Sequence, residues 1–286
     1  MHYVTAKTIL SPKNGMNLYR GCSHGCIYCD SRSERYNMDH DFEDIEVKEN
    51  ALELLKKELI KRPKAMIGTG SMTDPYIPAE SHLQYVRKSL EMIYRYGFGF
   101  TCITKSDLVL RDLDLLEKIN EKAKAVVQMT LTTADDDLCR IIEPNVCPTS
   151  RRVEVLKELD DAGIPTVVWM CPILPYINDD FENIKEILDF CVEVNVKGIF
   201  CFNMGLTLRD KNRLYFYEKL DEHFPGLKER YIKEFGDSYC VGSPNNDDLM
   251  KYFKGRTADA GIMSDTYEIL TYLREFPQKS VQSKLI

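Results

Sequence analysis

The sequence predicts an α/β fold: a partial (β/α)6 TIM-like barrel with a helical C-terminal extension. Two observations lead to this prediction. From about residue 45 onward, short apolar segments alternate with segments of helical periodicity, and such alternation forms a parallel sheet with right-handed crossovers. The apolar segments are also nearly continuous in hydrophobic residues, as strands buried on both faces are. A doubly wound open sheet is the rival arrangement, but six units that end in motif-bearing loops favour the barrel.

The first strand and helix follow from local patterns. Residues 16–20 are the first expected strand, and residues 47–61 are expected to form a helix because apolar side chains recur there at helical spacing. Residues 65–70 are a short apolar run that ends in glycine, as a buried strand should. We therefore expect the first complete strand–helix–strand unit in this part of the chain.

The next helix, at 81–96, has sequence signals at both ends. Ser81 and Gln84 have the spacing of a capping box, and Gly97 follows the last periodic residue. The remaining pattern repeats through the middle of the chain. Further strands are expected at 98–105, 125–132, 166–173 and 198–203, and further helices at 111–123, 150–162, 180–194 and 211–223.

The last sixty residues differ from the rest. They show no clear strand and hold two or three helical patterns. We therefore expect a barrel over residues 1–224 and a helical cap over residues 225–286.

Composition narrows the class of protein. The chain has 286 residues, ten cysteines and a net charge of −7. No apolar run approaches the roughly 18 residues of a membrane span, and the N-terminal segment has no signal-peptide pattern, so a cytoplasmic protein without membrane contact is expected. In a reducing compartment the cysteines are expected to be thiols or metal ligands. The acidic balance makes a nucleic-acid substrate possible but not favoured.

Three of the cysteines fall within eight residues. Cys22, Cys26 and Cys29 form a C-x3-C-x2-C motif, and thiolates are the usual ligands of Fe–S clusters. Three ligands on one loop can hold three irons of a [4Fe–4S] cluster and leave the fourth iron open. Gly21 and Gly25 allow the loop to curl tightly. Because the loop follows an expected strand, it is expected at the C-terminal mouth of the barrel, where active sites lie.

A structural zinc site is the alternative interpretation of this motif, with His24 or His40 as a fourth ligand. Zinc sites usually pair C-x2-C with a second, distant pair of ligands, and the sequence shows no such pair. The five histidines show no pairing that predicts a second metal.

The motif, with the aromatic Tyr28 just before its last cysteine, resembles the signature of the radical S-adenosylmethionine (radical SAM) superfamily. The resemblance implies a partial (β/α)6 barrel and a [4Fe–4S] cluster whose open iron chelates S-adenosylmethionine. It also implies one-electron cleavage of that cofactor to a 5′-deoxyadenosyl radical. Four further segments resemble the branch that contains spore photoproduct lyase: 68–80, 103–116, 143–165 and 172–179.

The same resemblance implies contacts with S-adenosylmethionine. It implies that Ser71, Thr73 and Asp74 hold the methionyl amino group, whereas an ordinary Asp-Pro turn is the alternative for the last of these. The residues implied for the carboxylate, the ribose or the adenine are Tyr28, Lys105, Thr130 and Arg152. Arg151 is the neighbour most easily mistaken for Arg152.

One position departs from the family pattern. Spore photoproduct lyase carries a hydrogen-donating cysteine near the end of its second strand, and the matching residue here is Ser71. A serine O–H is a far poorer hydrogen-atom donor than a thiol, so thymine-dimer repair by that route is not predicted. Cys171 and Cys201 are candidate replacements, although small apolar packing is the usual role of a strand cysteine. Tyr76 is a third candidate redox group.

These observations predict a radical SAM enzyme that abstracts hydrogen from an unidentified substrate, with a flavodoxin or ferredoxin as the implied electron donor. The cofactors supply the difficult chemistry and the protein orients them. A spore photoproduct lyase-like enzyme of nucleic-acid repair or modification is one alternative. A zinc-stabilised binding protein without catalysis is an alternative of another class.

Overall fold

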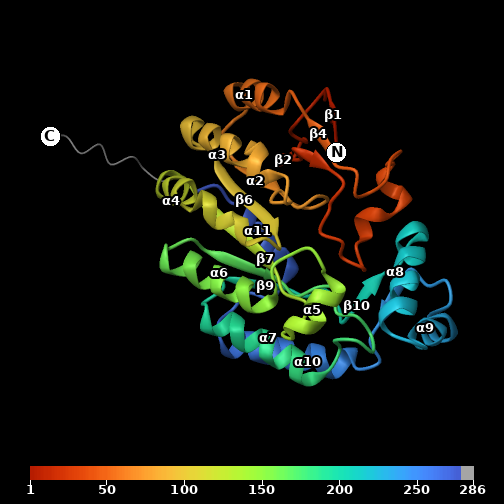
Figure 1. Cartoon of the computed structure of the whole chain (residues 1–286). Coiled ribbons are helices and arrows are strands. Elements are labelled where there is room, and N and C mark those ends of the chain that lie inside the picture. Colours follow the sequence, from red (N-terminus) through yellow and green to blue (C-terminus); the bar gives the residue numbers. More distant parts are fainter. Residues whose placement is uncertain (278–286) are drawn as a thin grey trace.

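The computed structural model describes residues 1–277 (Figure 1). Six strands form one parallel sheet in the order β2, β5, β6, β7, β8, β9. The strands follow one another in chain order across the sheet, without the reversal of a doubly wound fold. The predicted α/β partial barrel is therefore confirmed. The strands are Gly15–Met16 (β2), Met66–Thr69 (β5), Gly99–Thr104 (β6), Ala125–Thr130 (β7), Thr166–Trp169 (β8) and Gly198–Phe200 (β9).

Helices cover the outer face of this sheet (Figure 1). The longer of these helices turn an apolar stripe inward, and Leu55, Leu59, Leu116 and Ile119 are fully buried. The helices of this layer are α1 (Ala51–Lys61), α2 (Glu80–Leu83), α3 (Tyr85–Tyr96), α4 (Leu113–Lys122), α5 (Asp136–Ile142), α6 (Thr149–Asp161) and α7 (Phe181–Glu193), with a 3-10 turn, η3 (Asp107–Asp112), before α4.

The helix predicted at 81–96 is interrupted. Gln84 has a left-handed backbone (φ 56°), so α2 ends there and α3 begins anew. The buried carboxylate of Glu80 accepts the first two backbone N–H groups of α3, at 2.9 and 3.1 Å. The predicted capping box at Ser81 and Gln84 is therefore wrong, because a carboxylate from the preceding turn satisfies these donors instead. The end at Gly97, with φ 70°, is confirmed.

The strand predicted at 16–20 divides into two. Its first part, β2, joins the barrel, whereas its second part pairs with a separate three-stranded sheet in the order β1, β4, β3. The start of the helix predicted at 47–61 also belongs to this sheet, because Val47 is buried there as a strand residue. The strands are β1 (His2–Val4), β3 (Tyr19–Arg20) and β4 (Glu46–Lys48), and two 3-10 turns, η1 (Asp30–Arg32) and η2 (Glu34–Tyr36), follow β3.

The C-terminal part contains three helices, where the sequence predicted two or three, and also a strand that the sequence did not reveal. Strand β11 pairs antiparallel with β10, which lies before the predicted boundary at residue 224. Gly205 is required in this pair, since a Cβ atom there would lie 2.3 Å from the carbonyl oxygen of Val241. The elements are β10 (Gly205–Thr207), α8 (Asp210–His223), α9 (Leu227–Phe235), β11 (Cys240–Gly242), α10 (Asn246–Asp259) and α11 (Thr266–Arg274).

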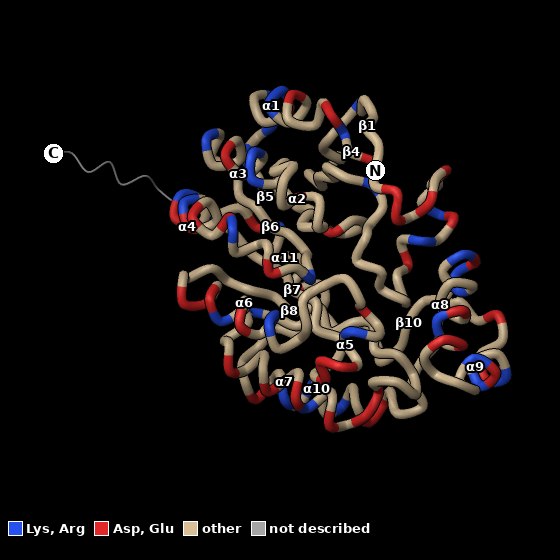
Figure 2. The backbone as a smooth tube through the Cα atoms, in the orientation of Figure 1, with Lys and Arg blue, Asp and Glu red and all other residues tan. Residues whose placement is uncertain are grey.

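The C-terminal helices pack onto the barrel. Helix α10 contacts α7, and α11 contacts β9, where Met263 forms a backbone bridge with Gly198. Charged side chains follow the outer helices and loops, while the central strands are largely free of them (Figure 2). Within residues 1–277, no helix has the length and apolarity needed to cross a membrane.

Candidate active site at the cluster loop

The cysteine loop begins directly after β3 and is held by backbone contacts. Gly21 and Gly25 have positive φ values of 84° and 74°. A Cβ atom at Gly21 would lie 2.5 Å from the carbonyl oxygen of Phe42, the oxygen that accepts the N–H of Cys22 at 2.9 Å. Close approach of these two backbone segments therefore requires glycine at position 21.

The spacing of the loop thiols fits a cluster better than a single ion. In the part of the chain that the structure describes, the sulfur atoms of Cys22, Cys26 and Cys29 do not all lie within 4.8 Å of one another. A tetrahedral zinc ion needs its ligands closer than that, whereas a [4Fe–4S] cluster binds each thiolate at a separate iron. Three thiols on one loop would hold three of its irons.

Both histidines considered as a fourth zinc ligand have other partners. The imidazole Nδ1 of His24 lies 3.4 Å from the Asp74 carboxylate, and burial lowers the pKa of His24. His40 lies beside Glu46 instead of beside the thiols. The loop thiols themselves are largely buried, and burial raises the pKa of Cys22 to about 12. Binding of a metal must therefore supply the energy to deprotonate these thiols.

Asp74 connects three loops at the mouth of the barrel. Its carboxylate accepts the hydroxyl of Thr104 and the backbone N–H of Lys105, both at 2.8 Å. It also accepts the backbone N–H of Tyr76 at 2.8 Å and faces His24 on the cluster loop. Both carboxylate oxygens thus accept hydrogen bonds, so Asp74 fixes the relative positions of the ends of β5 and β6 and the cluster loop.

A fully buried ion pair lies behind the loop. Arg152 pairs with Glu143 at 2.5 Å, and neither side chain is exposed. Arg152 also donates to the carbonyl oxygens of Cys147 and Thr130, at 2.9 and 3.0 Å. The hydroxyl of Tyr28 donates to the Glu143 carboxylate. The helix after Pro148 thus connects to the cluster loop through a chain of buried polar contacts.

The charges of this network stabilise one another. Burial by itself raises the pKa of Glu143, but Arg152 and Lys105 outweigh burial and lower it. Burial likewise lowers the pKa of Lys105, but Cys26 and Glu143 outweigh burial and raise it. The Lys105 ammonium lies 5.8 Å from the centre of the Tyr28 ring. Lys105 therefore carries a positive charge directly behind the cysteine loop.

A cavity of about 890 Å³ opens beside the loop. The predicted site residues Tyr28, Cys29, Ser71 and Cys171 line it. None of its lining residues is Lys or Arg, and its one carboxylate, Asp30, pairs with Arg209 at 3.3 Å. The rest of the lining comes from strand ends and the C-terminal segment: Trp169, Pro172, Phe202, Asn203, Gly205, Leu206, Thr207, Tyr239, Cys240, Val241, Gly242, Ser243 and Asn246.

Other predicted residues lie outside this cavity. Tyr76 is fully buried, its hydroxyl has no hydrogen-bond partner, and burial raises its pKa well above the ordinary value. Cys201 is buried with its sulfur 3.6 Å from that of Met250. The structure therefore does not bring Tyr76 or Cys201 to the cavity surface, because the barrel closes around both. Thr73, Thr130 and Arg152 are buried and do not line the cavity.

Sequence reasoning missed the aromatic side of the cavity. Trp169 lies 4.3 Å from Phe200 and 5.9 Å from Phe202, measured between ring centroids. The indole N–H of Trp169 donates to Gln128 at 2.8 Å, and this bond fixes the plane of its ring. Phe202 remains 51% exposed. The only local signal was the aromatic content of the segments at 166–173 and 198–203.

The comparison with protein families identifies the motif. A sequence model described as the radical SAM superfamily matches residues 16–191, which include the cysteine loop and the barrel strands β5, β6, β7 and β8. The chain belongs to the radical SAM superfamily.

Relatives of this radical SAM protein occur in distant organisms. An uncharacterized protein of Mycobacterium tuberculosis (strain ATCC 25618 / H37Rv) is 30% identical over 224 residues, which cover 76% of this chain and 65% of the relative. An uncharacterized protein of Methanocaldococcus jannaschii is 33% identical over 166 residues, or 57% of this chain and 61% of the relative. The matches thus span less than two thirds of these relatives.

Solved structures share the fold. Spore photoproduct lyase complexed with dinucleoside spore photoproduct superimposes with a TM-score of 0.62 and 15% identity, covering 90% of this chain and 77% of that one. A point mutant of the same enzyme superimposes with a TM-score of 0.64 and 16% identity, covering 92% of this chain and 80% of that one. At this identity the likeness extends to the fold of the radical SAM chain, and not to its substrate.

Proposed function

We propose that this radical SAM protein cleaves S-adenosylmethionine reductively at a [4Fe–4S] cluster and abstracts hydrogen from a substrate in the adjoining cavity. One observation carries the proposal: Cys29 of the cluster loop lines the cavity together with Ser71 and Cys171. When bound, the cluster and S-adenosylmethionine supply the electron and the 5′-deoxyadenosyl radical, a reaction that water must not reach. The chain's own task is to hold both cofactors and the substrate.

The residues of the wall take two kinds of role. Ser71 lies at the cavity surface, where its hydroxyl can accept a hydrogen bond from the methionyl amino group. The charged Lys105 is the candidate partner of the carboxylate. Asp74 and Arg152 act as positioning residues, since their polar atoms already bind Thr104, Lys105 and Glu143. If Arg152 were to contact the carboxylate of S-adenosylmethionine directly, its guanidinium would have to leave Glu143.

The lining of the cavity favours an uncharged substrate group. It contains aromatic rings, amides and hydroxyls but no Lys or Arg, and Asp30 is already paired. An anionic group would lose its hydration there without a cation to replace it. A planar or apolar group would instead pack against Trp169 and Phe202.

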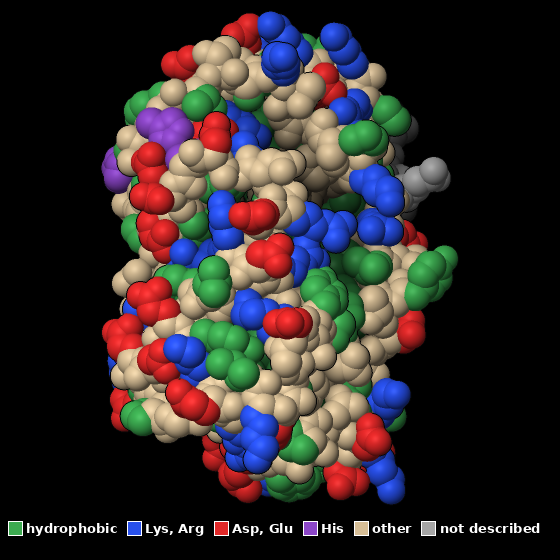
Figure 3. Space-filling view, turned by 90° about the vertical axis from the view of Figure 1, so that its right-hand side faces the viewer, with side chains coloured by type: hydrophobic (Ala, Val, Ile, Leu, Met, Phe, Trp, Pro, Cys, Tyr) green, Lys and Arg blue, Asp and Glu red, His purple; other side chains and the backbone are tan. Residues whose placement is uncertain are grey.

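A nucleic-acid substrate is the second candidate. A structural neighbour is bound to a dinucleoside photoproduct, and a flipped base is itself uncharged and planar. Such an enzyme also needs cations along the phosphate backbone, whereas basic and acidic side chains are interspersed on the face shown in Figure 3. Retention of the protein on single-stranded DNA at about 50 mM salt would favour this candidate.

The experiment that tests the proposal is anaerobic reconstitution with iron and sulfide, followed by reductant and S-adenosylmethionine. We expect 5′-deoxyadenosine from the native chain and none from Cys22→Ala. Cys191→Ala, which removes a buried thiol from α7, is the matched control and should retain the product. A flavodoxin or ferredoxin is the proposed biological reductant. Iron uptake without product, with dithionite and with flavodoxin, would refute the chemistry. Uptake of zinc alone would favour a zinc-stabilised binding protein.

A further inference from the structure

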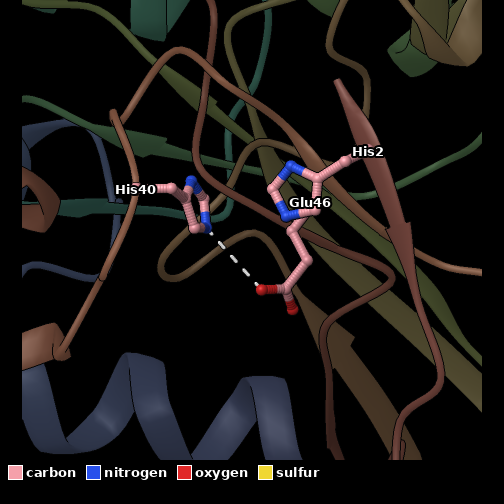
Figure 4. Close-up of side chains that lie close together, drawn as sticks. All are labelled: His2, His40 and Glu46. Carbon is pink, nitrogen blue, oxygen red and sulfur yellow. Dashed lines mark ion pairs between the residues drawn. The ribbon is translucent and has the colours of Figure 1, made fainter.

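Three potential metal ligands meet in the small sheet behind the cysteine loop. His2 on β1 and Glu46 on β4 are direct partners in the register of these parallel strands. His40 approaches from the segment that precedes β4. One ligand atom from each residue lies within 4.8 Å of the other two, and Figure 4 shows the three side chains converging.

The hydrogen bonds of the two rings leave one nitrogen of each available. The Nδ1 atom of His2 lies 2.9 Å from the Asp44 carboxylate, and Nδ1 of His40 lies 3.0 Å from the carbonyl oxygen of Asp41. Both partners are acceptors, so in both rings Nδ1 carries a proton. A carboxylate or backbone carbonyl behind a histidine is the usual support of a metal-ligating imidazole.

The second nitrogen of His40 needs a partner. This Nε2 atom is buried and makes no hydrogen bond, and it lies 3.6 Å from the Glu46 carboxylate. His40 and Glu46 are only 14% and 13% exposed as side chains. A lone pair facing a carboxylate in such a place is unfavourable unless a cation, either a proton or a metal ion, lies between them. The guanidinium of Arg20, at 3.9 Å from Glu46, is too distant to fill that place.

We propose that His2, His40 and Glu46 form a binding site for a divalent transition-metal ion, with zinc as the best match, separate from the cysteine cluster. Two imidazoles and one carboxylate are a ligand set that zinc uses, with water in the fourth position. Zinc–ligand bonds of about 2.0–2.1 Å place neighbouring ligands roughly 3.4 Å apart. His40 Nε2 and the Glu46 carboxylate already lie 3.6 Å apart, and all three ligand atoms lie within 4.8 Å of one another. Closing the longest of these separations to the zinc spacing therefore requires a shift of at most about 1.4 Å, within the range of small χ rotations.

The site has a consequence for the cluster loop. His40 belongs to the same segment as Phe42, whose carbonyl oxygen binds the N–H of Cys22. A metal ion would tie this segment to strands β1 and β4, and so would fix one wall of the cysteine loop. The site is therefore structural, and it does not depend on the proposed cleavage of S-adenosylmethionine.

Metal titration of the cluster-loaded chain, without an affinity tag, tests the site. We expect one Zn²⁺ beyond the cluster metals, measured by elemental analysis after gel filtration, and a higher melting temperature with added Zn²⁺. His40→Ala should weaken zinc binding by about 100-fold and Asp44→Asn by about tenfold. His82→Ala, which changes an exposed histidine on α2, is the matched control and should bind as the native chain does.

Cobalt distinguishes this site from the thiols. Co²⁺ bound by His2, His40 and Glu46 should show ligand-field bands but no sulfur-to-cobalt charge-transfer band. The same bands should remain when the three cysteines of the cluster loop are replaced by serine. Glu46→Gln, which keeps the shape of the side chain, should remove these bands if His40→Ala fails to fold. Equal zinc binding by the native chain and either variant, or no zinc at 100-fold excess, would overturn the proposal.

Discussion

On the β5–β7 side of the barrel mouth, charged side chains are buried and matched, whereas the β8–β9 side is aromatic and open. Glu143 and Arg152 have no exposed side-chain surface, while Phe202 on the other side is half exposed. Ion pairs that are buried must be complete to be tolerated, so the first side is rigid before any ligand arrives. The second side leaves aromatic surface uncovered, where the proposed substrate would pack.

The largest expected effect comes from breaking the buried pair. Arg152→Met leaves the Glu143 carboxylate without its cation, and we expect it to lower the free energy of unfolding by about 3–5 kcal/mol. Urea denaturation monitored by circular dichroism measures this change. The neighbouring Arg151→Met removes only partly exposed ion pairs and should cost about 1 kcal/mol or less. Equal losses in the two variants would contradict the contrast between a rigid and an open side.

The same pair predicts how stability depends on pH. Arg152 and Lys105 lower the pKa of Glu143 below that of an unfolded glutamate. The stabilisation is therefore complete above about pH 4.3, the ordinary value, and is lost as the pH falls through the lower native pKa. Glu143→Gln should show a shallower loss of stability below this pH. Acid denaturation measures this difference. If the curves of Glu143→Gln and of the native chain are parallel below about pH 4.3, Glu143 is not ionised in the folded protein.

Thiol reactivity compares the two sides directly. Under anaerobic conditions, Cys240 of the cluster-loaded protein should react first with iodoacetamide because it is exposed. Cys171 should follow slowly, since burial raises its pKa to about 12 although it lines the cavity. Cys102, which is fully buried in β6, should react only on unfolding. Peptide mass spectrometry gives the order, and reaction of Cys102 before Cys171 would argue against a closed β5–β7 side.

The smallest effect is expected on the open side. Phe202→Ser removes a ring that is 51% exposed, so the free energy of unfolding should change by about 0.5 kcal/mol or less. Formation of 5′-deoxyadenosine without substrate should stay within about twofold, because the ring lies on the proposed substrate side. A larger loss of stability, measured by urea denaturation, would place Phe202 in the structural core.

Local sequence patterns were sufficient for much of the fold. The alternation of apolar and helical segments predicted the six-stranded order, and Gly97 ended its helix as expected. The prediction failed where a distant group decided a local structure. Glu80 caps α3 from the preceding turn, and residues 16–20 divide because β3 pairs with β4 about thirty residues away.

The sequence by itself determined the family and the cysteine loop, because the spacing of three cysteines within eight residues is a local property that can be read directly from the sequence. Only the tertiary structure decided which residues reach the cavity. It buried Tyr76 and Cys201, and it brought Trp169 and Phe202 to the surface that the antiparallel pair of β10 and β11 completes. It also joined His2, His40 and Glu46, whose pairing depends on the register of β1 against β4. Contacts between segments far apart in the chain depend on packing, which no local spacing records.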